Sequence, residues 1–128
     1  MAEVKKILFV DDDAFLLDMY SLKFSKAGYD VKTADSSANA LKILRDGYSP
    51  DIMLVDIIMP EMDGLELIGL VRKEKLTSGA IIMLTNQGSP EDIARSKKLT
   101  VDGYIVKATT IPSEVLSEVE KIYNSKKV

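Results

Sequence analysis

Short apolar runs recur along the chain at steady intervals, and each has the length of a β-strand. The runs are ILFV at 7–10, IMLV at 52–55, AIIML at 80–84 and YIV at 104–106. They are rich in β-branched residues and apolar throughout, which is typical of strands covered on both faces of a parallel sheet. The segment YDVKTA at 29–34 alternates more between apolar and polar residues, so we predict a strand nearer an edge.

Amphipathic helical patterns lie between these runs. The predicted helices cover 14–27, 37–45, the apolar positions that follow Asp63, 89–99 and 113–123. Gly28 follows the first helix as a C-terminal cap, and Ser36 or Ser37 suits the N-cap of the second. Ser89 and Pro90 suit the N-cap and the first helical position of the fourth.

The regular alternation of strands and helices indicates the fold class. A β-α unit that occurs five times with short connections predicts an α/β three-layer sandwich, in which a parallel sheet lies between two layers of helices. The 128 residues suit one domain with its own core, so we predict a single domain over 1–128. The last residues, NSKKV at 124–128, are predicted to form a polar tail.

Polar side chains follow four of the five predicted strands. They are Asp11, Asp12 and Asp13 after the first strand, Asp56 after the third, Thr85 after the fourth and Lys107 after the fifth. Because ligands of open α/β sheets bind outside the carboxyl ends of the strands, we expect these side chains to meet at one edge. Taken singly, each has an ordinary explanation, such as Asp12 or Asp13 as a helix cap. Their joint position favours a functional site.

Three carboxylates at one edge need something that offsets their repulsion. Two of them about 4 Å apart repel by roughly 4 kcal/mol at an effective dielectric of about 20. Oxygen ligands alone favour a hard cation, and a partly hydrated Mg²⁺ held by Asp11, Asp12 and Asp56 fits best. A carboxylate can also attack phosphorus, with Lys107 as a point charge and Thr85 as a hydroxyl donor to the phosphoryl oxygens.

Composition excludes several other kinds of chemistry. The chain has no cysteine and no histidine, so thiol chemistry and histidine-dependent zinc sites or triads lack their usual residues. The net charge of −3 argues against general binding to nucleic acids or membrane surfaces. The only early apolar run is too short for a signal peptide or a membrane span, so we predict a cytoplasmic protein.

Four motifs stand at the strand ends, in the order ILFVDDD, DIIMPEMDG, MLTNQ and YIVKA. They resemble the motifs of the receiver domain of two-component response regulators, and the resemblance extends from about Lys5 to Tyr123. It implies a flavodoxin-like (βα)5 sandwich with strand order 2-1-3-4-5. It also implies that Asp56 accepts a phosphoryl group from a sensor histidine kinase or a histidine phosphotransfer protein. The signal would pass to an output protein through the fourth helix, fifth strand and fifth helix.

The resemblance further implies a role for each site residue. Asp12 would bind Mg²⁺ directly, Asp11 would bind it directly or through water, and Asp56 and the backbone carbonyl of Ile58 would complete the protein ligands. Thr85 and Lys107 would bind the phosphoryl oxygens. Tyr104 would be the aromatic switch residue, which turns inward when Thr85 is drawn toward the phosphoryl group.

Four residues depart from the pattern of the family. Ala108 follows Lys107 where a proline is usual, so the loop after it should differ. Thr100 stands where glycine is usual, which predicts a local rearrangement. Asn86 is bulkier than the usual residue, so we expect it to narrow the access of a phosphoryl group to the site. Ile58 is apolar at a position that often tunes hydrolysis, so we predict slow loss of the phosphoryl group.

Two other functions remain open at this point. A degenerate receiver would bind a partner without being phosphorylated, although all the site positions are filled. A Mg²⁺-dependent phosphatase with an aspartyl nucleophile would use the D-x-D spacing of Asp11 and Asp13, but the chain leaves no room for the cap domain that such enzymes need. A nucleotide-binding domain is unsupported, since neither G-x-G-x-x-G nor a P-loop follows the first strand. We therefore expect a signalling domain that catalyses only its own phosphorylation and dephosphorylation.

Overall fold

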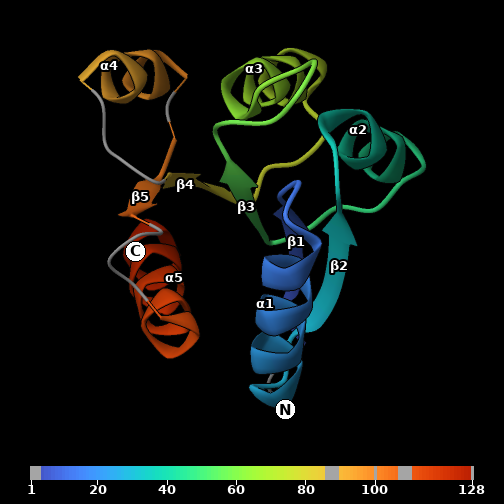
Figure 1. Ribbon diagram of the computed structural model, residues 1–128, viewed down its shortest axis with the longest axis vertical. Coiled ribbons are helices and arrows are strands. Elements are labelled where there is room, and N and C mark those ends of the chain that lie inside the picture. Colours follow the sequence, from blue (N-terminus) through green and yellow to red (C-terminus); the bar gives the residue numbers. More distant parts are fainter. Residues whose placement is uncertain (1–3, 86–89, 100, 107–110, 128) are drawn as a thin grey trace.

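The computed structural model describes residues 4–85, 90–99, 101–106 and 111–127. Strands and helices alternate through these residues, as the apolar pattern predicts (Figure 1). The elements are β1 (Lys6–Val10), α1 (Ala14–Lys26), β2 (Asp30–Ala34), α2 (Ser37–Arg45), β3 (Ile52–Asp56), α3 (Gly64–Glu74), β4 (Ala80–Thr85), α4 (Pro90–Lys98), β5 (Gly103–Val106) and α5 (Pro112–Lys127).

The five strands form one parallel sheet of order β2-β1-β3-β4-β5. This confirms both the predicted strand order and the predicted edge position of β2. In Figure 1, α1 and α5 lie on one face of the sheet, and α2, α3 and α4 lie on the other. The predicted three-layer sandwich is therefore confirmed.

Each face of the sheet has its own hydrophobic core. Every residue of β3 and β4 is buried, because helices cover both faces of these central strands. On the side of α1 and α5, aromatic rings pack around Phe9, whose ring centroid lies 5.5 Å from that of Tyr20 and 4.9 Å from that of Phe24. Leu67 and Ile68 of α3 are fully buried in the core on the opposite side.

Side-chain caps fix where the helices near the carboxyl edge begin. Asp13 is the N-cap of α1, and its side chain accepts hydrogen bonds from the backbone N–H groups of residues 15 and 16. Ser36, not Ser37, caps α2. Asp63 and Glu66 form a reciprocal capping box at the start of α3, which confirms that this helix begins directly after Asp63. These caps hold the loops that carry the acidic side chains.

The C-terminal helix is longer than its apolar pattern predicts. Helix α5 continues through Lys127, so the prediction of a polar tail is wrong for residues 124–127. This segment has no glycine or proline to end the helix. Apolar periodicity identifies only the part of a helix that packs against a core, and it therefore misses this final turn.

Lys75, at the C-cap of α3, has a left-handed backbone conformation with a φ angle of 52°. This conformation costs a residue with a Cβ about 1–2 kcal/mol, whereas glycine adopts it freely. We expect Lys75→Gly to raise the free energy of unfolding by about 0.5–1 kcal/mol in urea denaturation, the gain being reduced by the greater freedom of glycine in the unfolded chain. Lys73→Gly, within the same helix, should instead lower it by about 1 kcal/mol. Equal destabilisation by both substitutions would contradict this account.

Candidate functional site

Three aspartates meet at the carboxyl edge of the sheet, next to the point where the strand order reverses. Asp11 and Asp12 follow β1 and Asp56 ends β3, and these two strands are neighbours in the sheet. One carboxylate oxygen from each aspartate lies within 4.8 Å of the other two. The structure thus brings together three of the side chains that the sequence singles out.

The three carboxylates differ in burial. Asp11 and Asp56 are only 2% and 4% exposed, whereas Asp12 is exposed. The carboxylate of Asp11 accepts a hydrogen bond of 2.9 Å from the backbone N–H of Asp13, which orients it at the end of β1. Asp12 is therefore the member of the cluster that contacts solvent, while the other two aspartates are held within the fold.

The loop after β3 turns back sharply, so that the start of α3 packs against Asp56. The backbone N–H of Gly64 donates a hydrogen bond of 2.8 Å to the carbonyl of Ile57. A Cβ atom on Gly64 would lie 2.1 Å from the carbonyl oxygen of Asp56, a distance that no side chain tolerates. The glycine of the MDG motif thus permits the close approach that fixes the backbone of Asp56.

We expect Gly64→Ala to destabilise the protein, because the new methyl group would displace the backbone of Asp56. The expected cost is about 1–3 kcal/mol, typical of overpacking, measured by urea denaturation. Gly69→Ala is a matched control in the same helix, since its Cβ would meet nothing closer than a side-chain carbon of Leu99 at 3.9 Å. It should be neutral or stabilising. Similar unfolding free energies for the two variants would rule out the proposed clash.

Two side chains from neighbouring helices hold the loop between β3 and α3. The hydroxyl of Ser37, a residue that is 2% exposed, donates a hydrogen bond of 2.9 Å to the carbonyl of Met62. Arg95 of α4 forms an ion pair with Asp63 at 3.4 Å. Sequence reasoning considers Ser37 only as a helix cap, and nothing local distinguishes it from Ser36. Only the tertiary structure turns one of these serines toward the loop.

Thr85 and Tyr104 lie on the neighbouring strands β4 and β5. Thr85 ends β4 and is 2% exposed, and Leu84 before it is in register with Asp56. Thr85 therefore lies at the same edge of the sheet as the acidic cluster. Tyr104 is half-buried and packs against the core on the side of α2 and α3.

Of the two remaining site residues, the structure describes Ile58 but not Lys107. Ile58, two residues after Asp56, is 67% exposed. Lys107 lies outside the described residues, as do the three departures from the family pattern at Asn86, Thr100 and Ala108. Their predicted roles stay predictions.

The acidic cluster fits a hard divalent cation. It offers carboxylate oxygens from two adjacent strands, and the side chain of Asp12 faces solvent, so that a bound ion would keep part of its water shell. Mg²⁺ is commonly held in this way by a few carboxylates and several waters. Softer metals prefer imidazole or thiolate ligands, and the chain contains neither.

Fold and site together define a flavodoxin-like α/β domain with an acidic cluster at the point where the strand order of its sheet reverses. The chain belongs to the response regulator receiver domain family, whose sequence profile matches residues 7–120. It is therefore a receiver domain of two-component systems, which is a signalling domain.

Comparison with individual proteins agrees with this assignment. The chain is 34% identical over 118 residues to the alkaline phosphatase synthesis transcriptional regulatory protein PhoP of Bacillus subtilis, covering 92% of this chain and 48% of that protein. The chain thus spans about half the length of the curated relatives it matches. The chemotaxis protein CheY4 of Vibrio cholerae superimposes with a TM-score of 0.87 at 30% identity, over 94% of this chain and 99% of that one.

A second solved structure shows the same likeness. The CheY-like receiver domain protein of Methanospirillum hungatei has a TM-score of 0.88 at 28% identity, over 98% of each chain.

Within the described residues, none of the helices combines the length and the apolar character that crossing a membrane requires.

Proposed function

We propose that this receiver is switched by phosphorylation of Asp56. The phosphoryl donor is a phosphohistidine on a sensor histidine kinase or a histidine phosphotransfer protein. The observation that carries the proposal is the meeting of Asp56 with Asp11 and Asp12 at the carboxyl edge of the sheet, with oxygen atoms within 4.8 Å of one another. Carboxylates crowded in this way suit a site that handles a cation and a phosphoryl group together.

In the proposed reaction, a carboxylate oxygen of Asp56 attacks the phosphorus atom of the donor. A new oxygen–phosphorus bond forms as the bond from phosphorus to the imidazole nitrogen breaks. The nitrogen keeps the electron pair and is protonated from water, and Asp56 becomes an acyl phosphate. The hydroxyl of Thr85 and the ammonium group of Lys107 then donate hydrogen bonds to the phosphoryl oxygens.

The protein ligands of a bound Mg²⁺ would be Asp11, Asp12, Asp56 and the backbone carbonyl of Ile58. When bound, the ion offsets the charge of the carboxylates and of the incoming phosphoryl oxygens. Asp11, held by the backbone N–H of Asp13, would be oriented before the ion arrives. Asp12, which is exposed, would move more as the ion binds.

Phosphorylation would then be read through α4, β5 and α5. Thr85 would shift toward the phosphoryl group, and Tyr104 would turn inward into the space that this shift opens. Such a switch needs two conformations that differ by only a few kcal/mol, so that the new contacts decide between them. An output protein would bind the surface that changes, and the domain would act on no external substrate.

Intact-mass spectrometry after incubation with acetyl phosphate and Mg²⁺ tests the proposed function. We expect the mass of one phosphoryl group to be added to the protein. No added phosphoryl group would favour a receiver that binds partners without modification. Sustained turnover of a generic phosphate ester, such as p-nitrophenyl phosphate, would favour the aspartyl phosphatase.

Ile58 should make the phosphorylated state long-lived. Its side chain is exposed beside the site and has no polar group to orient an attacking water. We expect Ile58→Asn to lose its phosphoryl group several-fold faster than the wild type, measured as the decay of the phosphorylated mass after removal of acetyl phosphate. Ile58→Val, which stays apolar, should decay at the rate of the wild type. Equal or slower decay of Ile58→Asn would show that this position does not control hydrolysis.

A further inference from the structure

The edge strand β2 presents one side of its backbone away from the sheet. The N–H of Asp30 donates to the carbonyl of Lys5, and the carbonyl of Ala34 accepts from the N–H of Asp11, so these two residues face β1. Backbone groups alternate in direction along a strand. Those of Val31 and Thr33 therefore point outward, at an edge of the sheet where no other strand of the described residues pairs with β2.

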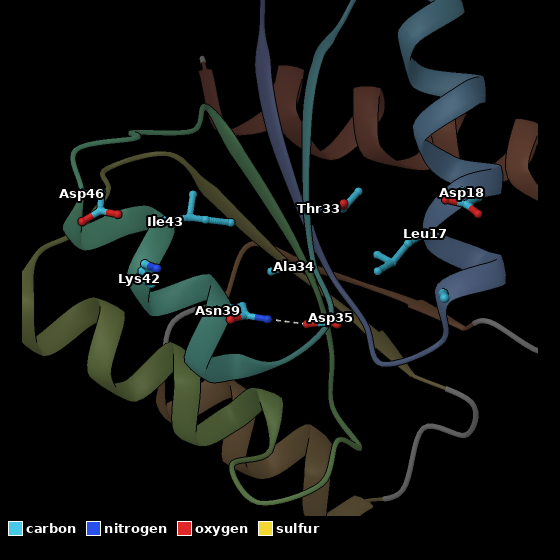
Figure 2. Close-up of a pocket in the computed structure, with 10 residues that line it drawn as sticks. Leu17, Asp18, Thr33, Ala34, Asp35, Asn39, Lys42, Ile43 and Asp46 are labelled. Carbon is cyan, nitrogen blue, oxygen red and sulfur yellow. Dashed lines mark hydrogen bonds between the residues drawn. The ribbon is translucent and has the colours of Figure 1, made fainter.

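A groove of about 560 Å³ lies beside this edge. Figure 2 shows β2 between the two helices that line it, with α1 on one side and α2 on the other. Ile43 of α2 is half-buried and supplies apolar surface beside the exposed Thr33, whereas Leu17 of α1 and Ala34 of β2 also line the groove but are buried. The groove thus combines apolar side chains with outward-facing backbone groups, which are the two features that an added β-strand uses.

The charged side chains that line the groove are mostly acidic. Asp18, Asp35 and Asp46 contribute three carboxylates, and Lys42 is the one cation among the described lining residues. Lys32, on the same strand, lies over the ring of Tyr48, 4.9 Å from its centroid. This excess of negative charge favours an occupant that carries positive charge.

We propose that the groove along β2 binds an extended segment of a partner protein that carries lysine or arginine, as an additional strand of the sheet. Its backbone would pair with Val31 and Thr33, and its cationic side chains would lie near Asp18, Asp35 and Asp46. A second copy of this chain suits the groove poorly. A two-fold contact would bring the same three carboxylates of each copy toward one another. The proposal does not depend on phosphorylation of Asp56.

Titration of a fluorescent peptide, in which lysine and valine alternate, tests this binding by fluorescence anisotropy. Thr33→Pro should weaken binding by about tenfold or more, because proline removes one outward N–H and obstructs the ladder. An edge strand tolerates proline where its N–H faces away from the sheet. Thr33→Val keeps the N–H and should bind within about twofold of the wild type. The double variant Asp18→Asn with Asp46→Asn should bind more weakly, most clearly at low salt.

Equal binding to Thr33→Pro and Thr33→Val would overturn the proposal, and so would equal binding of a peptide with glutamate in place of lysine. A second measurement covers the case in which Thr33→Pro fails to fold. The bound peptide should slow hydrogen exchange at the Val31 and Thr33 amides of the wild type, and unchanged exchange would also overturn the proposal.

Sedimentation of the chain alone checks for a dimer through β2. Such a dimer would identify a second copy as the occupant and would overturn the proposal of a partner segment. The magnesium response of folded Thr33→Pro should equal that of the wild type, which separates this test from the proposed function.

Discussion

Replacing Asp56 by asparagine is expected to abolish the uptake of a phosphoryl group from acetyl phosphate. Asparagine has nearly the same shape, but its amide is a far weaker nucleophile than a carboxylate and cannot form the acyl phosphate. Intact-mass spectrometry should show the added phosphoryl group on the wild type and none on Asp56→Asn. The substitution also removes one of three crowded negative charges, so the fold should not lose stability without metal.

Asp13→Asn is the matched control for this variant. Asp13 is the N-cap of α1, next in the chain to Asp12 but not a member of the three-carboxylate cluster. Asparagine caps helices as well as aspartate does, so the fold should be kept. We expect Asp13→Asn to take up the phosphoryl group as the wild type does. Uptake by Asp56→Asn at the level of the wild type would mean that another residue is the acceptor.

The second large effect is expected in the response of thermal stability to Mg²⁺. An ion that binds only the folded state stabilises it by about 2.7 kcal/mol when its concentration is one hundred times its Kd. The melting temperature of the wild type should therefore rise with added magnesium chloride and return with EDTA. Asp12→Ala should lose most of this rise, because it removes the exposed carboxylate of the cluster. The same change should leave the metal-free protein as stable as the wild type, or more stable, because repulsion falls.

Thermal unfolding followed by circular dichroism, with and without Mg²⁺, measures both effects for Asp12→Ala. Asp13→Asn again serves as the control, and its magnesium response should match that of the wild type. If Asp12→Ala kept the full response, Asp12 would not be a metal ligand. If Asp13→Asn lost the response too, the effect would reflect general acidity at this end of the sheet and not a defined site.

Much of the fold can be predicted from the sequence, because the local patterns that favour strands and helices agree with the way these elements pack in the structure. The fully apolar runs at 52–55 and 80–84 correspond to the two central strands, which are buried along their whole length. The alternating segment at 29–34 corresponds to the edge strand β2, part of which faces solvent. Asp63 before an apolar pattern predicts the start of α3, and the structure adds Glu66 as the second half of a capping box.

The acidic cluster was predictable for a topological reason. In a parallel sheet all strands present their carboxyl ends on the same side, so residues directly after β1 and at the end of β3 must lie near one another once the strands are neighbours. The meeting of Asp11, Asp12 and Asp56 follows from this topology alone. The roles of Thr85 and Tyr104 as switch residues require knowledge of a second conformation, and they stay predictions.

Other features depend on tertiary contacts that no local pattern encodes. The hydroxyl of Ser37 reaches the carbonyl of Met62 across 25 positions of sequence, although Ser36 beside it is equally suited to either role. The close approach of Gly64 to Asp56 is visible only once α3 packs against β3. The groove beside β2 is formed by two helices on opposite faces of the sheet, so its acidic lining is dispersed through the sequence.

Chemical localisation of the phosphoryl group tests the central claim most directly. Borohydride reduces an aspartyl phosphate to homoserine, which peptide mass mapping identifies at a single residue. After incubation with acetyl phosphate and Mg²⁺, we predict homoserine at position 56 of the wild type, and none there when Mg²⁺ is replaced by EDTA. Homoserine at another aspartate, or at none, would contradict the assignment of Asp56 as the phosphoacceptor of this receiver domain.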